Sequence, residues 1–395
     1  MNICLVIISD GWGGAETVVY ELAKNLLNKG VNVSIILNQE IKKYYDSLDG
    51  IDIFNIGHVY NLMLMTRSIF SSKIRIKKKD MSLTFLYYLM ESLRPLYFKR
   101  ISKAVMLFLT DRKIDLINTH LIKADMLVSN LNNLRIPWIG TIHGAYNPPW
   151  FHLYYKKLEL ERFNFMDKII FMSKWTSRNF NDRISIKEKS IVIHCGIDIS
   201  NFHKNSINKL ELKGNFNILF PGGSKSMKGG GVVVQALKQV RQSVQDIHLY
   251  IALNVSKKSI IRKMVKDFHL EEHVSFLGFV QKKRYFEYLR AMDVLVLPSK
   301  DEAFGIVNIE AMALGKPIIA SNQGGIPEAV INGRNGVLIE PNAEDVAEAI
   351  LYLYRNEDVR RHMGENNLQD SKKFAWDRII DKYVDLFKET INNAG

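Results

Sequence analysis

Two glutamates, eight positions apart, flank an apolar stretch in the segment DEAFGIVNIE, residues 301–310. The preceding run VLVLPS (294–299) is typical of a strand, and IVNIEAMALG (306–315) has apolar residues at helical spacing until Gly315 ends it. Glu302 is therefore predicted in the loop before the helix, and Glu310 one turn inside it. Both carboxylates then lie beside exposed N–H groups, which suits the binding of sugar hydroxyls. An acid that complements a helix dipole explains one glutamate but not both.

A second candidate site is the segment PGGSKSMKGGG (221–231), which follows a strand-like run and precedes a helix. Its two lysines, Lys225 and Lys228, stand among glycines, and two ammonium groups beside a helix N-terminus suit a diphosphate. The segment lacks the Gly-Lys-Ser/Thr ending of a Walker loop, which disfavours ATP hydrolysis. The alternative is a solvated, lysine-rich turn.

A third loop, GWGGAE (11–16), lies between the first predicted strand and the first predicted helix. Gly13 and Gly14 allow a phosphate or a sugar to approach the backbone at a helix N-terminus. Because position 16 is Glu, the loop does not match the Gly-x-Gly-x-x-Gly pattern of dinucleotide-binding proteins. On its own the loop is equally compatible with a plain tight turn.

The elements that must position these residues are apolar runs alternating with helical stretches. In the first half, the predicted strands are 3–8, 31–37, 51–56, 115–120, 138–143, 168–173 and 190–194. In the second half, they are 216–222, 247–253, 274–278, 294–299, 317–321 and 336–340. This alternation predicts an α/β protein with two Rossmann-like, doubly wound parallel sheets. Such sheets bind ligands at the carboxyl ends of their strands, so we expect the two domains to face a central cleft.

The polar, weakly patterned stretch 198–215 is the predicted linker. We therefore expect an N-terminal domain over 1–197 and a C-terminal domain over 216–375. A final helix over 376–395 is expected to cross back to the first domain. A basic and aromatic insert near 57–113 interrupts the first domain.

That insert accounts for much of the net charge of +13, since twelve Lys or Arg residues stand against three acids between Arg67 and Lys113. A basic, aromatic segment suits an anionic membrane surface or a nucleic acid, and the alternative is a solvated, lysine-rich helix. No nucleic-acid-binding motif accompanies it, so we expect no nucleic acid as a partner.

Composition and length exclude several classes of protein. Of the 395 residues, 47% are apolar and 24% are charged, as in ordinary globular proteins. The longest apolar runs, such as KAVMLFLT (103–110), are shorter than the ~18 residues of a membrane span. No signal-peptide pattern opens the chain, and two cysteines cannot form a disulfide framework. We expect a cytoplasmic protein, with peripheral contact to the cytoplasmic face of a membrane if the insert binds lipid.

The segment PSKDEAFGIVNIEAMALGKPIIASNQGGIPEAVINGRNGVLIEP (298–341) resembles the signature of glycosyltransferase family 4, in which the Glu-x7-Glu pair, EAMALGKPIIAS and GGIPE follow in this order and spacing. Supporting matches are GGAETVVYELAKNL (13–26), TIH (141–143), DKIIFMSKWTSRNF (167–180), CGID (195–198), KGG (228–230) and FAW (374–376). Residues 57–113 have no counterpart. The resemblance implies the GT-B fold and retaining transfer of a sugar from a nucleotide sugar. It also implies that the domain over 1–197 is the acceptor side and that the domain over 216–375 binds the nucleotide sugar.

The resemblance also implies roles for matched residues. Glu302 is expected to hold the hydroxyls of the donor sugar, together with the main chain of Phe304, Gly305 and Ile306. Glu310 is expected to bind the ribose.

Lys228 is expected to bind the diphosphate, with the Gly14 N–H from across the cleft and Gly13 beside it. Where the family often has Arg, this chain has Ser224, so Lys225 is expected to supply the second positive charge.

Two loops complete the expected site. The segment FLGFV (276–280) is expected to place Phe279 and Val280 near the base. His143 is expected at the reacting sugar, which makes it a catalytic residue together with Glu302 and Lys228. His120 is an acceptor-side candidate, although a lone histidine at a strand end more often has a structural role.

The expected reaction moves a sugar from a nucleotide diphosphate sugar, UDP-linked by family analogy, to a hydroxyl of a glycan or a lipid-linked acceptor in surface polysaccharide or glycolipid assembly. Lysines and helix N-termini can stabilise the leaving diphosphate, and the chain contains no Asp-x-Asp motif, so we expect neither a metal ion nor a cofactor. The alternatives are a GT-B-like epimerase and a non-catalytic nucleotide-sugar-binding protein. A phosphorylase would need a pyridoxal lysine, for which no motif is present.

Overall fold

The computed structural model describes residues 1–57, 100–131, 134–144, 162–182, 186–203, 210–222, 226–252, 256 and 259–394. The chain divides into two compact units. Unit 1 comprises Met1–Met172, Ser177–Ile193 and Ile379–Gly395, and unit 2 comprises Ser173–Thr176 and His194–Arg378. The described part of the predicted linker, 198–203 and 210–215, therefore belongs to unit 2. Most of the basic insert, residues 58–99, lies outside the described ranges.

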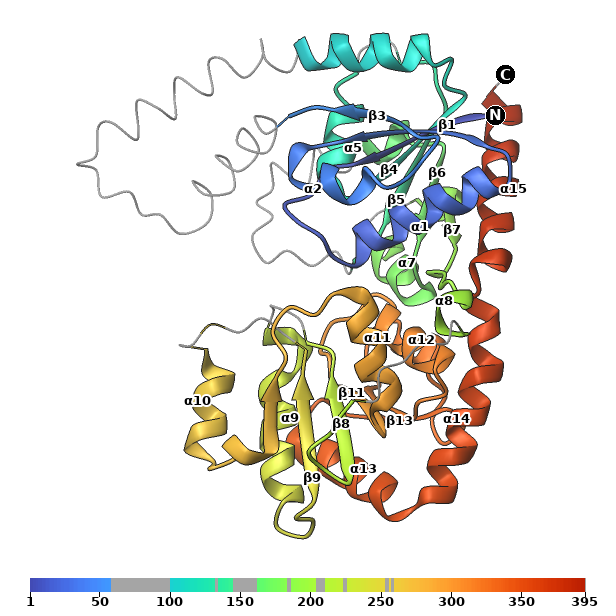
Figure 1. The fold of residues 1–395 in the computed structure, drawn as a ribbon. Coiled ribbons are helices and arrows are strands. Elements are labelled where there is room, and N and C mark those ends of the chain that lie inside the picture. The colour runs from blue at the N-terminus through green and yellow to red at the C-terminus, as the bar shows by residue number, and fades with distance from the viewer. Residues whose placement is uncertain are drawn as a thin grey trace, which may run out of the picture. The chain divides into compact units, whose positions relative to one another are not determined.

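Unit 1 is built on a seven-stranded sheet with strand order β3-β2-β1-β4-β5-β6-β7 (Figure 1). Its strands are β1 (Asn2–Ile7), β2 (Asn32–Leu37), β3 (Asp52–Asn55), β4 (Leu116–His120), β5 (Trp138–Ile142), β6 (Lys168–Phe171) and β7 (Ser190–Val192). Every neighbouring pair is parallel. Because helices cover both faces of a parallel sheet, strands such as β4 and β5 are buried along their whole length. All seven strands predicted for this half are confirmed.

The helices of unit 1 include α1 (Gly14–Asn28), α2 (Gln39–Tyr45), α5 (Ile122–Val128), α7 (Lys174–Asn181, whose first residues belong to unit 2), a helix at 100–111 and α15 (Trp376–Ala394). The apolar stripe of α1 packs into the core through Val18, Val19 and Leu22. Helix α15 joins unit 1 through buried Tyr383 and Phe387, and its Asp381 lies 2.6 Å from the Lys29 ammonium.

Unit 2 has a six-stranded parallel sheet with strand order β10-β9-β8-β11-β12-β13. Its strands are β8 (Phe216–Phe220), β9 (Ile247–Ile251), β10 (Val274–Phe276), β11 (Val294–Leu297), β12 (Ile318–Ser321) and β13 (Gly336–Ile339). These are the six strands predicted for this half. Strands β8 and β11 are neighbours at the centre of this sheet, and the loops after them carry the charged residues of interest.

The helices of unit 2 are α8 (Ser200–His203), α9 (Gly230–Val240), α10 (Ile260–Asp267), α11 (Lys282–Ala291), α12 (Ile306–Ala313), α13 (Ala343–Arg355) and α14 (Glu357–Ser371) among the described residues. Figure 1 shows α9 and α10 on one side of the sheet and α11 and α12 on the other. Helix α9 packs on α10 and α13, and α12 packs on α14. Apolar residues of α9 and α13 join those of the strands in one buried cluster. The sheet with helices on both faces is the doubly wound arrangement that the sequence predicts.

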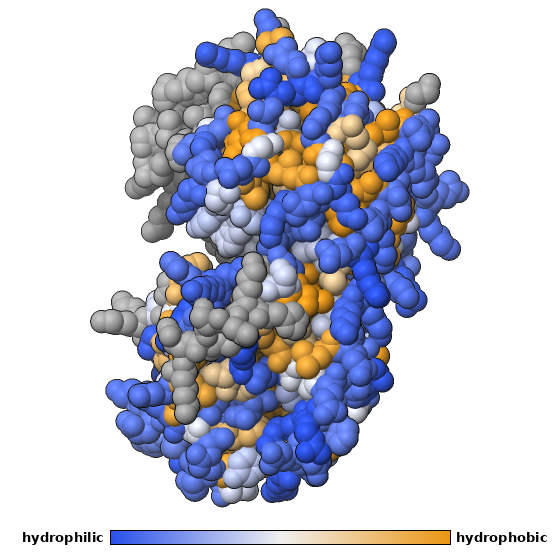
Figure 2. All heavy atoms as spheres, turned by 45° about the vertical axis from the view of Figure 1, so that its right-hand side comes forward, coloured by the Kyte–Doolittle hydropathy of each residue, from blue (hydrophilic) through white to orange (hydrophobic). Residues whose placement is uncertain are grey.

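Hydrophilic side chains predominate on the face drawn in Figure 2. Over the described part of the chain as a whole, the large apolar side chains that face solvent include Phe279 and Phe165, which are 74% and 71% exposed. Across the described ranges, no helix combines the length and the apolar composition needed to cross a bilayer.

Candidate functional site

The first charged group of interest is an ion pair between the Lys228 ammonium and the Glu302 carboxylate. Lys228 ends the 3₁₀ turn η2 (Ser226–Lys228), which follows β8, and Glu302 lies in the loop between β11 and α12. Because β8 and β11 are neighbours, residues 74 positions apart in sequence meet at the carboxyl edge of the sheet. Both side chains are part-buried, at 27% and 15% exposure, so a ligand can still reach them.

The turn that carries Lys228 is fixed to the loop that carries Glu302. The Lys300 N–H donates to the Met227 carbonyl at 2.8 Å. Gly229 has a φ of +84° and lies so close to Pro298 that a Cβ atom would stand 2.3 Å from the proline carbonyl oxygen. The glycine is therefore required both by its backbone conformation and by the close approach of the two loops.

Two further glycines, Gly324 and Gly325, pack on the backbone of the Glu302 loop. The Gly325 N–H donates to the Glu302 carbonyl at 2.9 Å. A Cβ atom on Gly324, whose φ is +64°, would lie 2.1 Å from that same carbonyl oxygen, and one on Gly325 would lie 2.0 Å from the Ala303 carbonyl oxygen. The Gly-Gly pair thus lets residues 324–325 pack directly on the backbone of residues 302–303.

Helix α12 begins directly after Gly305, whose φ of +83° turns the chain into the helix. Phe304 does not face solvent: its ring is 2% exposed and stacks on His194 at 4.8 Å between centroids. At Phe304 only the main chain is therefore left for a ligand. Gly305 and Ile306 begin the helix, where the first N–H groups have no intrahelical partners. The main-chain role that the family resemblance assigns to these residues stays a prediction.

Glu310 lies one turn into α12 and is 9% exposed. Burial, together with the negative charge of Glu310, raises the pKa of the Tyr285 hydroxyl in α11 well above its ordinary value. The structure thus places Glu302, Glu310 and Lys228 around the N-terminus of one helix of unit 2.

The remaining donor-side predictions are distributed over several loops. Phe279 and Val280 lie between β10 and α11, where Phe279 is strongly exposed. Gly13 is the N-cap of α1 and Gly14 is its first residue, and a Cβ atom on Gly14 would meet no atom within 4 Å. Ser224 and Lys225 lie outside the described residues.

In unit 1, His120 and His143 lie at the carboxyl ends of the neighbouring strands β4 and β5. His120 Nδ1 and His143 Nε2 are 2.8 Å apart. Burial lowers the pKa of His143 to about 4, and burial, together with His143, holds the pKa of His120 well below its ordinary value. Both imidazoles are therefore neutral at pH 7. His120 therefore does not stand alone, because the two rings form a pair; its acceptor-side role stays a prediction.

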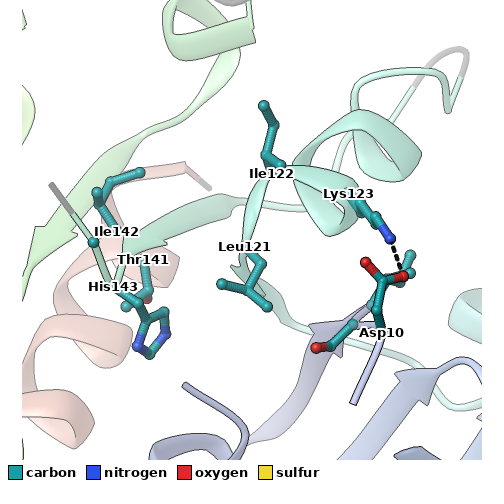
Figure 3. A pocket seen from close by; sticks show the side chains of 10 residues that line it. Asp10, Leu121, Ile122, Lys123, Thr141, Ile142 and His143 are labelled. Carbon is teal, nitrogen blue, oxygen red and sulfur yellow. Dashed lines mark hydrogen bonds and ion pairs between the residues drawn. The ribbon is translucent and has the colours of Figure 1, made fainter. Parts of the chain in front are cut away.

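His143 also lines a pocket of about 310 Å³ at this edge of the sheet (Figure 3). The pocket is lined by Ile8, Ser9, Asp10, Leu121, Ile122, Lys123, Thr141, Ile142, His143 and Gly144. In Figure 3, His143 and the Lys123–Asp10 ion pair lie on opposite sides of Leu121. The pocket therefore combines an apolar wall with polar groups at two ends. His120 is fully buried and does not line it.

Sequence reasoning assigned no role to Glu328 and His194, although both belong to the environment of the Glu302 loop. The Glu328 carboxylate accepts hydrogen bonds from the backbone N–H groups of Lys174 and Trp175 at 2.9 and 2.8 Å, and it lies 2.9 Å from His194 Nε2. Burial raises the pKa of Glu328, but these hydrogen bonds outweigh it and lower the pKa overall. Glu328 thus fixes the ring on which Phe304 stacks. The only signal in the sequence was the acid that ends GGIPE.

Among the described residues, no group of three or more His, Cys, Asp or Glu side chains is arranged to hold a metal ion.

Comparison with known proteins shows the family of this chain. Residues 12–201 match the family model "Glycosyltransferase Family 4", and residues 202–370 match "Glycosyl transferases group 1". An uncharacterised glycosyltransferase of Methanocaldococcus jannaschii is 32% identical over 283 residues, which cover 68% of this chain and 73% of the relative.

Two solved structures share the fold. Sucrose-phosphate synthase from Thermosynechococcus elongatus aligns with a TM-score of 0.77 at 19% identity, over 99% of each chain. Anabaena HepE, solved in complex with UDP, aligns with a TM-score of 0.75 at 19% identity, over 98% of this chain and all of HepE. The predicted GT-B fold is confirmed, and the chain belongs to glycosyltransferase family 4.

Proposed function

We propose that this glycosyltransferase moves a sugar from a UDP-linked donor to a hydroxyl of a glycan or lipid-linked acceptor, with retention at the anomeric carbon and without a metal ion. The observation that carries the proposal is the meeting of Lys228 and Glu302 beside the N-terminus of α12. One ligand with a diphosphate and a sugar matches that combination of one cation, one hydroxyl-binding acid and free backbone donors. The UDP bound by HepE supports uridine as the base.

In this proposal Lys228 exchanges partners when the donor binds. In the structure, its ammonium is paired with Glu302. A bound diphosphate offers it a stronger partner with more negative charge, which frees the Glu302 carboxylate to accept hydrogen bonds from the sugar hydroxyls. Glu310, one turn further along α12, then binds the ribose hydroxyls.

The proposed chemical step breaks the bond between the anomeric carbon and the diphosphate oxygen and forms a bond from the same carbon to the acceptor oxygen. The proton of the acceptor hydroxyl passes to the leaving phosphate oxygen on the same face of the sugar, which gives retention. Negative charge develops on the diphosphate, and the Lys228 ammonium and helix N–H groups stabilise it electrostatically. No protein nucleophile is required.

A screen of nucleotide sugars by thermal shift tests the donor assignment. A ligand that binds only the folded protein raises its melting temperature. A donor present at 100 times its dissociation constant stabilises the folded protein by about 2.7 kcal/mol. We expect UDP-sugars to give the largest shifts, with the hits then assayed on lipid-linked acceptors. A larger shift with another nucleotide would replace uridine in the proposal, and product with the inverted anomeric configuration by NMR would overturn retention.

We also propose peripheral contact with an anionic membrane through the basic segment 67–113, most of which lies outside the described residues. Each Lys or Arg near an anionic surface contributes about 1 kcal/mol. Vesicles containing anionic lipid should therefore bind the protein at low salt and release it at high salt. Replacing Lys77, Lys78 and Lys79 by Gln should weaken sedimentation with vesicles, whereas activity on a soluble acceptor analogue should persist. If the vesicles do not bind the protein, or bind it independently of salt, the segment is instead a solvated, lysine-rich insert.

A further inference from the structure

The pair of histidines in unit 1 constrains where their protons lie. His120 is the last residue of β4 and His143 follows β5, and their rings contact each other through His120 Nδ1 and His143 Nε2 at 2.8 Å. A neutral imidazole carries one N–H and one acceptor nitrogen. One ring must therefore donate in this hydrogen bond, and the other must accept.

The surroundings of His120 decide which ring donates. The His120 side chain is fully buried, and its other nitrogen, Nε2, has no hydrogen-bond partner within the described part of the chain. If the proton were on Nε2, a buried N–H donor would be left unpaired. If it is on Nδ1, only an acceptor lone pair is left unpaired. Orphaned buried N–H groups are rarer in proteins than under-satisfied acceptors, so the proton belongs on Nδ1.

We infer that His120 is a positioning residue that fixes His143 as a hydrogen-bond donor: His120 donates from Nδ1 to His143 Nε2, and His143 carries its own proton on Nδ1. His143 lines the 310 Å³ pocket, and Nδ1 is the nitrogen left to meet a ligand. The low pKa values of both rings support neutral imidazoles in this arrangement.

The tautomer of His143 determines which kind of ligand atom its Nδ1 can bind. A ring fixed in this tautomer donates a hydrogen bond to a sugar or acceptor oxygen, and it does not take the proton from an acceptor hydroxyl. This role rests on the proposed function, in which the leaving phosphate oxygen takes that proton. The tautomer itself does not rest on it, so the two can fail separately.

The direct test is long-range ¹H–¹⁵N NMR of the full-length protein labelled with ¹⁵N-histidine at pH 7. The chain has ten histidines, and His143→Gln and His120→Asn identify the two sets of signals by their loss. We expect both rings to be neutral and protonated on Nδ1. A proton on His143 Nε2, or an imidazolium at either position, would overturn the inference whether or not the protein is active.

Variants of His120 add a functional readout. An Asn side chain keeps an N–H donor near the place of Nδ1, whereas Leu removes it and Asp can only accept. We expect His120→Leu to lower kcat/KM roughly tenfold, the size expected for one lost hydrogen bond, and His120→Asn to recover most of that loss. In His120→Asp, the His143 proton should move to Nε2. Exposed His362 of α14 provides the matched control, His362→Asn. Equal activity of the Leu and Asn variants would reduce His120 to a packing residue.

Discussion

Replacing Gly324 by Ala tests whether the Glu302 loop is held by close backbone packing. Gly324 has a φ of +64°, and a Cβ atom there would lie 2.1 Å from the Glu302 carbonyl oxygen. The left-handed conformation alone costs an Ala residue about 1–2 kcal/mol. Relieving the overlap requires the backbone of the Glu302 loop to shift, which adds on the order of 1–3 kcal/mol. The expected loss of folding free energy is therefore about 2–5 kcal/mol.

Gly333→Ala is the matched control, because Gly333 also belongs to unit 2 and has a φ of +74°, but a Cβ atom there would meet nothing within 4 Å. This variant should lose only the conformational part, about 1–2 kcal/mol. Each kcal/mol corresponds to roughly 2–4 °C in melting temperature for a unit of this size, so calorimetry can separate the two variants.

The two glycine variants should also differ in donor binding. Because the shift in Gly324→Ala displaces the Glu302 backbone, we expect weaker binding of the donor in titration calorimetry, whereas Gly333→Ala should bind it as the wild type does. Equal losses of stability and unchanged donor affinity in both variants would refute the account of how this loop is held.

Three further predictions concern charged and titratable groups. Glu310→Ala should mainly weaken nucleotide binding, and Glu302→Ala should mainly lower kcat. Each effect should be roughly ten- to hundredfold, since a hydrogen bond to a charged group contributes about 1.5–3 kcal/mol. Unchanged steady-state kinetics in both variants would contradict the assignment. Lys225→Ala should lower turnover and Ser224→Arg should partly restore it, because Arg supplies the missing charge; wild-type turnover of Lys225→Ala at saturating donor would rule this out. Burial lowers the pKa of His143 from 6.5 to about 4, so the unfolded chain binds the proton more readily and stability is lost as the pH falls between these values. Denaturant titrations should show a smaller loss for His143→Gln over that window.

The fold could be predicted because parallel strands buried on both faces are continuous apolar runs. Segments such as WIGTI in β5 and VLVL in β11 are apolar almost throughout. Gly30 and Gly315 follow the helices α1 and α12 and end them. The same patterns place Glu302 after β11 and Lys228 after β8. Which strands become neighbours depends on the connections between them, so the ion pair between these two residues could not be predicted.

The contacts that fix the site are the part that sequence reasoning missed. Glu328 caps backbone N–H groups more than 150 positions earlier in the chain, and Gly324 matters because of its distance to one carbonyl oxygen. His120 and His143 are 23 positions apart, and the sequence did not predict that they pair, because their contact depends on β4 lying beside β5. Such contacts depend on three-dimensional distances, which residue type and spacing do not contain.

The most direct test of the central claim is the release of UDP from a panel of UDP-sugars by the wild-type protein and by Lys228→Ala, with exposed Lys388→Ala of α15 as the control. The account predicts slow release without an acceptor for the wild type and for Lys388→Ala, and almost none for Lys228→Ala even at saturating donor. Unchanged release by Lys228→Ala, or no release from any UDP-sugar by the wild type, would contradict it.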